Sequence, residues 1–409
     1  MIKLPMNHIY KKLGVPTIVN AKGPATRLSG GLMAEAVSKA MQEATQYCVD
    51  MTELQSRASE IISDITGAEA GFVTSGAAAG LLLGTAACVA GLDPGKMNKL
   101  PDTSGMQNEI IVVRSQRNLY DHALRTVGVK LVEVGLPDRY SGAGVRDAEV
   151  WEIADAINEK TAAIYFVANS RSKPSLNEVT EVAHGFEIPV LVDAAGQVPP
   201  VENLKRFIKE GADLVTISGG KAIKGPQGSG ILCGRRDLVA SAALQNLDQD
   251  IFFDQWLPPP GLFDKSIMKG LPQHGIGRAC KVGKEQVVGL LVALKLFAES
   301  SVEDQHQKYM KTLEFMVEKL DSKLQSLTKI VENPESGEPA LELRDKSNDT
   351  TQAFAIMLNL EQLKPAIHCD PSKIDEGILI IWASCMKTGD AEYIVEVLNK
   401  FVKNDTIFS

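Results

Sequence analysis

Apolar runs alternate with amphipathic segments through the middle of the chain. Short β-rich runs predict strands at residues 71–74, 110–113, 130–134, 162–167, 189–192, 214–217 and 229–233. Segments with apolar residues at helical spacing lie between these runs, at 147–158, 176–186 and 201–210. Strand–helix alternation is typical of parallel strands joined by crossover helices that cover both faces of a sheet. We therefore predict an α/β fold here.

The two ends of the chain have a different pattern. An irregular, glycine-containing opening precedes a helix from about residue 32. After the α/β region come helical patterns at 286–298 and 306–327, strand-like runs at 341–344, 353–358 and 378–382, and a last helix at 391–402. We predict a segment 1–50 that packs with the small domain, a large α/β domain 51–290, and a small α+β domain 291–409.

A proline-rich stretch, residues 248–277, has few periodic signals and predicts a long ordered excursion of the kind that lines a site or a subunit contact. Four aromatic residues there are candidates to shape a small-substrate pocket: Phe252, Phe253, Trp256 and Phe263. His274 is a candidate acid–base group, and a histidine in an ordinary turn is the alternative.

Composition and charge narrow the function classes. The 43 Lys and Arg residues against 51 Asp and Glu give a net charge of −8, which lacks the basic face that nucleic-acid binding needs. The six cysteines show no CxxC spacing and predict neither disulfides nor a metal site. The most apolar stretch, 80–92, is too short to span a bilayer, and the first twenty residues lack a signal-peptide core. We expect a cytoplasmic protein with no nucleic-acid or membrane partner.

A lysine directly follows a predicted strand and two glycines, in the segment LVTISGGKAIKGPQGSGIL from Leu214 to Leu232. Lys221 would be fixed by the scaffold and open to a ligand. A partly desolvated amine of this kind suits a Schiff-base lysine, because it loses its proton more readily. A surface lysine in a turn is the alternative interpretation, and Lys224 is a competing lysine.

Two further strand ends carry candidate chemistry. Asp193 ends the run Val190-Leu191-Val192, and a carboxylate there faces the crevice in which α/β sheets bind ligands. In an enzyme that uses pyridoxal 5'-phosphate (PLP), such an aspartate keeps the pyridine nitrogen protonated; a helix-capping aspartate is the alternative. Ser75, Gly76 and Ala77 open a helix of small residues whose free N–H groups suit a phosphate. A close-packed helix start is the alternative there.

The order and spacing of these three signals follow the layout of fold-type I PLP enzymes. Ser218-Gly219-Gly220-Lys221 with Gly225-Pro226-Gln227 resembles the SGDK…GGPQ signature of the bacterial selenocysteine synthase (L-seryl-tRNA selenium transferase) family. The resemblance covers most of residues 15–300 and is better to its shorter, D-glucosaminate-6-phosphate ammonia-lyase-like members. Gly220 departs from the family aspartate, and Lys224 stands where the family has glycine.

The resemblance implies a role for each matching residue. Lys221 would bind PLP and shuttle the Cα proton, and Asp193 would bind the pyridinium nitrogen. The phosphate would be held by Ser75, Gly76, Ala77 and Ser218.

Residues after two other strands complete the predicted site. His122, or alternatively Tyr120, would lie over the PLP ring, although both also fit an ordinary helix-start turn. Asn169 and Arg171 would bind a substrate carboxylate, and a solvated loop arginine is the alternative.

The implied function is a PLP-dependent lyase. We predict Cα deprotonation and β-elimination on a small polar amino acid or amino sugar acid, because the acidic chain has no room for a tRNA-binding module before the catalytic core. The alternatives are a PLP-dependent racemase, aldolase or aminotransferase, a selenium or sulfur transferase acting on aminoacyl-tRNA, and a non-enzymatic binding protein. Sites in this fold commonly form between subunits, which implies a homodimer or a higher homo-oligomer.

Overall fold

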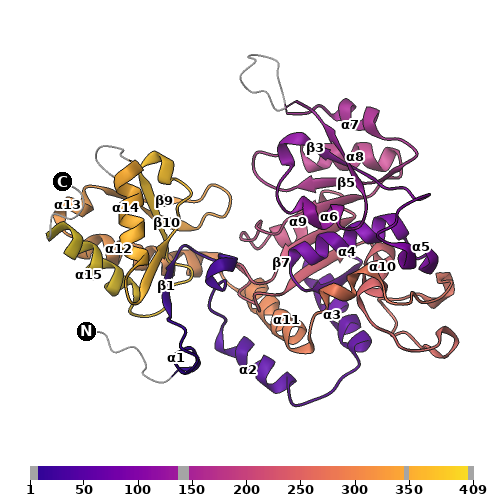
Figure 1. Cartoon of the computed structure of the whole chain (residues 1–409), viewed down its shortest axis with the longest axis horizontal. Coiled ribbons are helices and arrows are strands. Elements are labelled where there is room, and N and C mark those ends of the chain that lie inside the picture. Colours follow the sequence, from indigo (N-terminus) through magenta and orange to yellow (C-terminus); the bar gives the residue numbers. More distant parts are fainter. Residues whose placement is uncertain (1–7, 137–146, 345–349, 404–409) are drawn as a thin grey trace. The chain divides into compact units, whose positions relative to one another are not determined.

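The computed structural model describes residues 8–136, 147–344 and 350–403 and divides the chain into two compact units. The large unit comprises Met33–Glu299, and the small unit combines Met1–Leu32 with Ser300–Ser409 (Figure 1). These two units divide at residues 32 and 299, whereas the sequence predicts boundaries at residues 50 and 290. The reason is that α2 (Glu35–Ala44) packs on α11 (Lys284–Glu299) inside the large unit.

A seven-stranded sheet forms the centre of the large unit. Its strands lie in the order β2 (Ala70–Thr74), β8 (Gly230–Gly234), β7 (Leu214–Ser218), β6 (Val190–Asp193), β5 (Thr161–Val167), β3 (Glu109–Val113) and β4 (Lys130–Val134). β8 is antiparallel to both of its neighbours, and the pairings from β7 to β4 are parallel. The predicted α/β fold with a mainly parallel sheet is confirmed.

Helices cover both faces of this sheet because successive strand residues point to opposite faces. One core contains Tyr165, Leu191 and Leu214. It packs under α4 (Ala77–Ala90), α5 (Pro94–Lys99), α6 (Asp121–Arg125) and α10 (Arg236–Asn246). The other core contains Ile164, Val192 and Val215. It packs under α2, α3 (Met51–Thr66), α7 (Val150–Ala156), α8 (Leu176–Gly185), α9 (Asn203–Lys209) and α11. We call the first face the α4 face.

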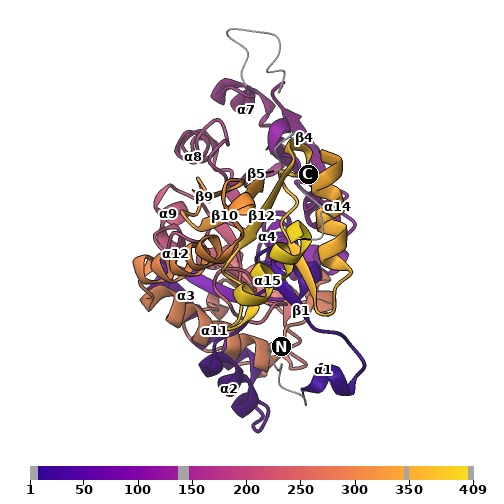
Figure 2. The ribbon, with the colours of Figure 1, turned by 90° about the vertical axis from the view of Figure 1, so that its left-hand side faces the viewer.

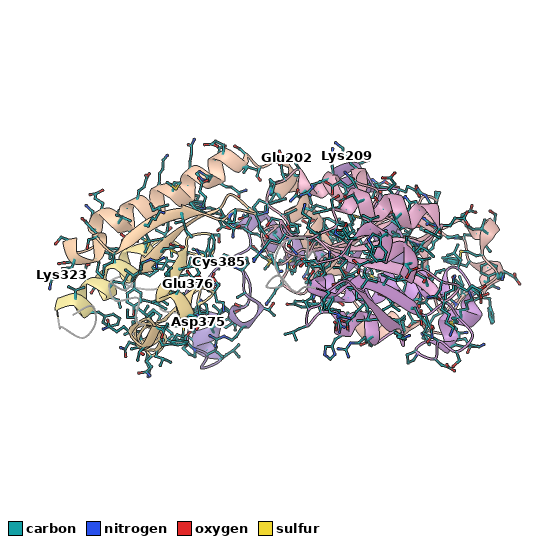
Figure 3. All side chains as sticks on the ribbon, turned by 90° about the horizontal axis from the view of Figure 1, so that it is seen from above. Glu202, Lys209, Lys323, Asp375, Glu376 and Cys385 are labelled. Carbon is teal, nitrogen blue, oxygen red and sulfur yellow. The ribbon has the colours of Figure 1, made fainter. Side chains whose placement is uncertain are left out.

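Two helices show how the sequence sets this packing. The amphipathic α9 buries Leu204 and Phe207, while Lys209 and the preceding Glu202 point to solvent (Figure 3). α4 is buried over nearly all of its length and can approach the sheet because its residues are small. A Cβ on Gly80 would lie only 2.3 Å from the Thr216 hydroxyl oxygen. This close approach brings the start of α4 to the carboxyl ends of the strands.

The described residues of the small unit form two small sheets. β1 (Ile18–Ala21) pairs in parallel with β11 (Ala366–Cys369), so the N-terminal segment joins the C-terminal residues (Figure 1). β9 (Thr328–Glu332), β10 (Pro339–Arg344) and β12 (Ile378–Trp382) form an antiparallel sheet in the order β12-β10-β9.

Helices flank these sheets. α12 (Val302–Lys319) packs on β10 and on α15 (Asp390–Lys403) (Figure 2). The other helices are α1 (Ile9–Lys12), α13 (Ser322–Gln325) and α14 (Thr350–Glu361). The strand predicted at 353–358 is wrong, because these residues lie in α14. Its buried residues Ala353, Ile356 and Leu360 are spaced by three and four positions, which is the period of a helix.

All six cysteines lie in the described part of the chain and all are free thiols. Burial raises the pKa of Cys88, Cys233 and Cys369 to about 12, so these thiols stay protonated at neutral pH. Within the described ranges, no helix combines the length and apolar character that a membrane crossing requires.

Candidate active site

The structure brings Lys221 and Asp193 together at the carboxyl edge of the large sheet. Asp193 is the last residue of β6, and Lys221 follows β7, the next strand in the sheet. The Lys221 amine lies beside Gly196, where a Cβ would be 3.5 Å from Nζ. The positive charge of Lys221 also lowers the pKa of Asp193. The lysine and the carboxylate therefore lie close enough for the charge of one to act on the other, which makes them candidates for one site.

Asp193 is a buried carboxylate with a partner on each oxygen. Its Oδ1 accepts the Ala195 backbone N–H at 3.0 Å, and its Oδ2 accepts the Tyr165 hydroxyl at 3.1 Å. Only 8% of the residue is exposed. Burial raises the pKa of Asp193, while the two hydrogen bonds and Lys221 act in the opposite direction. The carboxylate is thus costly to ionise alone and ready to pair with a cation.

Tyr165 contributes a hydroxyl to this edge of the sheet that no local pattern in the sequence indicates. It lies on β5 opposite Leu191, two residues before Asp193, so both side chains lie on the α4 face. The residue is 1% exposed. Burial and the nearby Asp193 charge raise the pKa of Tyr165, while a side-chain hydrogen bond with Asn118 lowers it. Its hydroxyl therefore stays protonated and can donate to Asp193.

The N-terminus of α4 lies at the same edge and has no side-chain cap. Its first residue follows Gly76, which has a φ of +97° and open space where a Cβ would be. The Thr216 hydroxyl donates to the Ala77 carbonyl at 3.1 Å and ties the helix start to β7. A Cβ on Gly230 would lie 2.7 Å from the Ala77 nitrogen. The tight backbone packing therefore holds a set of uncapped N–H groups in place.

Ser75 precedes this helix start, and its hydroxyl donates to the Cys280 carbonyl at 2.8 Å. Cys280 ends the 3-10 helix η5 (Ile276–Cys280). The bond anchors the α4 start to the segment after the proline-rich excursion.

The loop after β7 explains one departure from the family signature. A Cβ on Gly220 would lie 2.5 Å from the Gln227 Cα, so only glycine fits at this position in this chain. Gly219 donates its N–H to the Ser229 carbonyl at 2.9 Å, which closes the loop. Lys221 therefore extends from a tightly packed turn, and Lys224 follows in the same loop with a left-handed φ of 58°.

The other predicted site residues lie on a strand, in a loop after a strand, or on a helix. Ser218 is the half-buried last residue of β7. Asn169 and Arg171 are exposed after β5, and the Asn169 side-chain oxygen accepts the Arg171 N–H at 2.8 Å. His122 is exposed on α6, and Tyr120 just before it is exposed too. Among the described contacts, no hydrogen bond or ion pair joins His122, Asn169 or Arg171 to Lys221 or Asp193.

Gln116 adds a buried amide near the end of β3. Its side-chain oxygen accepts the Val167 N–H at 2.9 Å, and its Nε2 is buried with no partner in the described part of the chain. An unpaired buried donor costs stability unless a ligand or water accepts from it.

The proline-rich excursion divides its aromatic residues between core and surface. Trp256 and Phe263 pack edge to face with ring centroids 5.2 Å apart and belong to the core under α4 and α10. Phe252 is 79% exposed. Trp256 and Phe263 are therefore core residues of the large unit.

An exposed group at the ends of this excursion contains Asp248, Asp250 and His274, with ligand atoms within 4.8 Å of one another. The two Asp248 oxygens already pair with His274 and Arg278, each at 3.1 Å.

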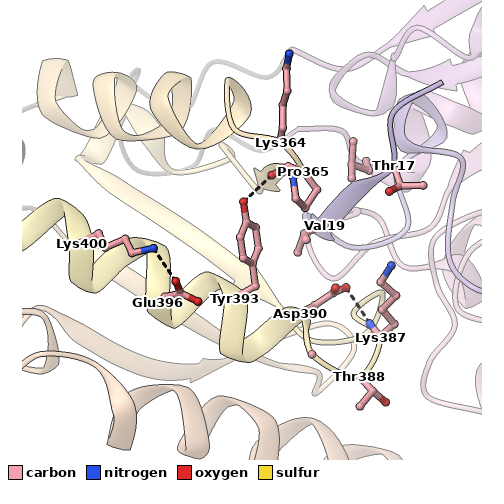
Figure 4. A pocket seen from close by; sticks show the side chains of 12 residues that line it. Thr17, Val19, Lys364, Pro365, Lys387, Thr388, Asp390, Tyr393, Glu396 and Lys400 are labelled. Carbon is pink, nitrogen blue, oxygen red and sulfur yellow. Dashed lines mark hydrogen bonds and ion pairs between the residues drawn. The ribbon is translucent and has the colours of Figure 1, made fainter. Parts of the chain in front are cut away.

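The small unit contains a separate cavity of about 370 Å³ between β1, the residues before β11 and the start of α15 (Figure 4). The Tyr393 hydroxyl donates to the Pro365 carbonyl there, and Lys400 pairs with Glu396 at 2.6 Å. None of the predicted site residues lines this cavity. We therefore place the candidate active site at the carboxyl edge of the large sheet, where the buried polar groups converge.

Comparisons with known proteins agree with this layout. The family model described as L-seryl-tRNA selenium transferase matches residues 25–256. The D-glucosaminate-6-phosphate ammonia lyase of Salmonella typhimurium is 28% identical over 97% of this chain and 98% of its own length. A 5'-C-glycyluridine monooxygenase-decarboxylase of a Streptomyces species is 31% identical over 76% of this chain and 71% of its own length.

Selenium transferases align with a smaller share of this chain than the ammonia lyase does. The enzyme of Actinobacillus pleuropneumoniae serotype 7 is 29% identical over 54% of this chain and 50% of its own length. A solved D-glucosaminate-6-phosphate ammonia-lyase structure superposes with a TM-score of 0.79, 26% identity, and coverage of 98% of this chain and all of the other. The chain therefore belongs to the L-seryl-tRNA selenium transferase family of PLP-dependent, fold-type I enzymes.

Proposed function

We propose that this protein is a PLP-dependent lyase that removes the Cα proton and a β-substituent from a small polar amino acid or amino sugar acid. The observation that carries the proposal is the convergence of Lys221, Asp193 and the uncapped start of α4 at one sheet edge. A lysine, a carboxylate and an anion site are the groups with which a protein can bind PLP and keep its pyridine nitrogen protonated.

The residues present fit PLP. Asp193 is buried with a raised pKa, so it gains most from a partner that carries a proton, such as a pyridinium nitrogen. The α4 start offers N–H groups without a side-chain cap and without an acidic residue in its first turn, which suits a phosphate. Lys221 provides the amine. When bound, PLP supplies an electron sink for the electron pair left by the departing Cα proton.

Lys221 would act as the proton carrier. Its turn is fixed by Gly219 and Gly220, so the amine can be presented reproducibly to the Cα–H bond of a substrate. General acid–base groups positioned in this way contribute roughly 10²- to 10⁴-fold in rate. Asp193 would hold a proton on the ring nitrogen, and Tyr165 and Ala195 would keep the carboxylate oriented.

Ser75, Gly76, Ala77 and Ser218 would hold the phosphate, Asn169 and Arg171 the substrate carboxylate, and His122 would cover the ring. Asn169 and Arg171 follow β5, which pairs with the strand that ends in Asp193, and are exposed, so a substrate can reach them. A planar guanidinium binds a carboxylate through two parallel hydrogen bonds.

We favour a lyase because of how much of each relative's length matches this chain. The ammonia lyase of Salmonella matches along nearly its whole length, whereas the selenium transferase of Actinobacillus matches over half of its own. We therefore favour β-elimination of water from a 2-amino sugar acid, followed by hydrolysis of the resulting imine to ammonia and a 2-keto acid, over transfer to an aminoacyl-tRNA. We also propose a homodimer or higher homo-oligomer.

A second candidate is oxidative decarboxylation, favoured by the 31% identity to the monooxygenase-decarboxylase. That reaction breaks the bond from Cα to the carboxyl group, and it consumes oxygen. Product analysis therefore separates the two reactions.

The test is a substrate screen with the PLP-loaded protein. D- and L-amino acids, 2-amino sugar acids with and without a 6-phosphate, and seryl-tRNA are assayed for ammonia, 2-keto acid, carbon dioxide, other products and oxygen uptake. Ammonia and keto acid in equal amounts, without oxygen uptake, would support the lyase. Oxygen uptake with carbon dioxide would favour the second candidate, and products formed only from an aminoacyl-tRNA would overturn both.

A further inference from the structure

We propose that Tyr165 is a positioning residue that sets the charge and orientation of Asp193, and through it the affinity for PLP. This inference rests on the proposed function, because it assumes that Asp193 pairs with the cofactor. Its observable basis is the 3.1 Å hydrogen bond from the Tyr165 hydroxyl to Asp193 Oδ2.

Packing explains the ring of Tyr165 but does not explain its hydroxyl. Its ring is part of the core under α4, but a phenylalanine would fill that space equally well. The hydroxyl reaches out of this core toward two polar side chains, Asp193 and Asn118. A tyrosine hydroxyl in a buried position needs a partner, and here the partner is the carboxylate of the site.

The Tyr165 hydroxyl lowers the pKa of Asp193. Burial raises the pKa of Asp193, and the Tyr165 hydrogen bond is one of the three influences that lower it. The other two are the Ala195 N–H on the segment after β6 and the charge of Lys221 on the loop after β7. Removing the hydroxyl therefore raises the pKa of Asp193 further and favours its neutral form, which cannot pair with a pyridinium.

The groups that face Tyr165 itself are also known. Asp193 and Asp121 both raise the pKa of Tyr165, and Asn118 lowers it. The Asp121 charge is compensated, because its two oxygens pair with Arg117 and Arg125. Tyr165 therefore remains a neutral donor across the range in which Asp193 titrates.

The experiment compares the PLP affinity of four apoproteins: wild type, Tyr165→Phe, Asp193→Asn and the double variant. A hydrogen bond to a charged group corresponds to roughly ten- to hundredfold in affinity. We expect Tyr165→Phe to weaken PLP binding by that factor at pH 7, and the loss to shrink to about twofold or less in the Asp193→Asn background. The matched control is Tyr393→Phe, which loses one hydroxyl bond to the Pro365 carbonyl in the small unit and should bind PLP as the wild type does.

A second readout needs no bound cofactor. The melting temperature of each apoprotein is measured against pH. Because the pKa of Asp193 is raised by folding, ionising it costs stability as the pH rises above the ordinary aspartate range. Tyr165→Phe should extend that loss of stability to higher pH. In the Asp193→Asn background, the protein with Tyr165 and the protein with Phe at that position should show the same pH dependence.

The outcomes separate the two proposals. If neither wild type nor Tyr393→Phe binds PLP, the proposed function fails. If wild type binds PLP but Tyr165→Phe binds it equally well, or loses the same factor with and without the Asp193 carboxylate, the proposed role of Tyr165 is overturned and the lyase proposal stands. An insoluble Tyr165→Phe would mean that the hydroxyl serves folding, and would overturn the role as well.

Discussion

Each of the two units contains a buried aspartate with a raised pKa, but the surroundings differ. Asp390 in the small unit is the first residue of α15, and its carboxylate accepts the Lys387 N–H three residues earlier at 3.0 Å. An acidic residue is favourable at the start of a helix, so the local chain explains it. Asp193 in the large unit ends a strand and has partners from β5 and from the loop after β7. Burial alone therefore does not mark a site; convergence of groups distant in sequence does.

The first prediction concerns the two lysines of the loop after β7. Lys221→Ala should lower turnover roughly 10²- to 10⁴-fold, because no other amine of the described residues lies beside Gly196 to move the Cα proton. Lys224→Ala, in the same loop, should retain most activity. Steady-state rates on a substrate found in the screen provide the measurement. Equal losses in both variants would remove the distinction between the two lysines.

The second prediction tests the two buried carboxylates directly. Asp193→Asn should lower kcat on the order of a thousandfold, because a neutral amide cannot hold a proton on the ring nitrogen. Asp390→Asn removes a carboxylate of similar burial in the small unit and should leave kcat within about twofold. If both variants keep wild-type rates, the contrast between the two aspartates has no catalytic meaning.

The third prediction concerns the turn that carries Lys221. Gly220→Ala would place a Cβ 2.5 Å from the Gln227 Cα, so it should destabilise the protein by about 1–3 kcal/mol. Gly228→Ala is the matched control, because nothing lies within 4 Å of its Cβ position. Thermal unfolding compares the two. A Gly220→Ala variant as stable as Gly228→Ala would show that the turn can rearrange.

The fourth prediction is the smallest and concerns pH. Burial raises the pKa of both Asp193 and Asp390, so each favours folding most below its ordinary pKa and loses that contribution as the pH rises through the raised value. Each asparagine variant should therefore flatten the fall of the apoprotein melting temperature above about pH 4. PLP should flatten the wild-type curve as well, but leave the contribution of Asp390 unchanged. Identical effects of PLP on both variants would contradict the pairing of PLP with Asp193.

Local patterns predicted the large unit well because its strands are apolar runs between amphipathic helices. They failed at 353–358, where an apolar run belongs to a helix, and they gave no sign of β1, whose partner β11 lies more than 340 residues away in the sequence. Strand pairing of this kind depends on the whole fold, which no local pattern contains.

The site was predictable where its residues carry a local signal. Lys221 follows two glycines and Asp193 ends an apolar strand, and the structure places them together. Tyr165 resembles any aromatic residue of a buried strand, and only the register of β5 against β6 places its hydroxyl on Asp193. The roles of His122, Asn169 and Arg171 stay predictions, since these exposed side chains make no described contact with the central pair.

The most direct test is to map the attachment point of the cofactor. The protein is loaded with PLP and treated with borohydride, which converts a PLP–lysine linkage into a stable pyridoxyl-lysine, and the peptides are analysed by mass spectrometry. We predict one labelled peptide, with the pyridoxyl group on Lys221 in wild type and no label in Lys221→Ala. A label on Lys224 would contradict the assignment of the lysine, and no label on any residue, with no absorbance of bound PLP, would contradict the proposed site itself.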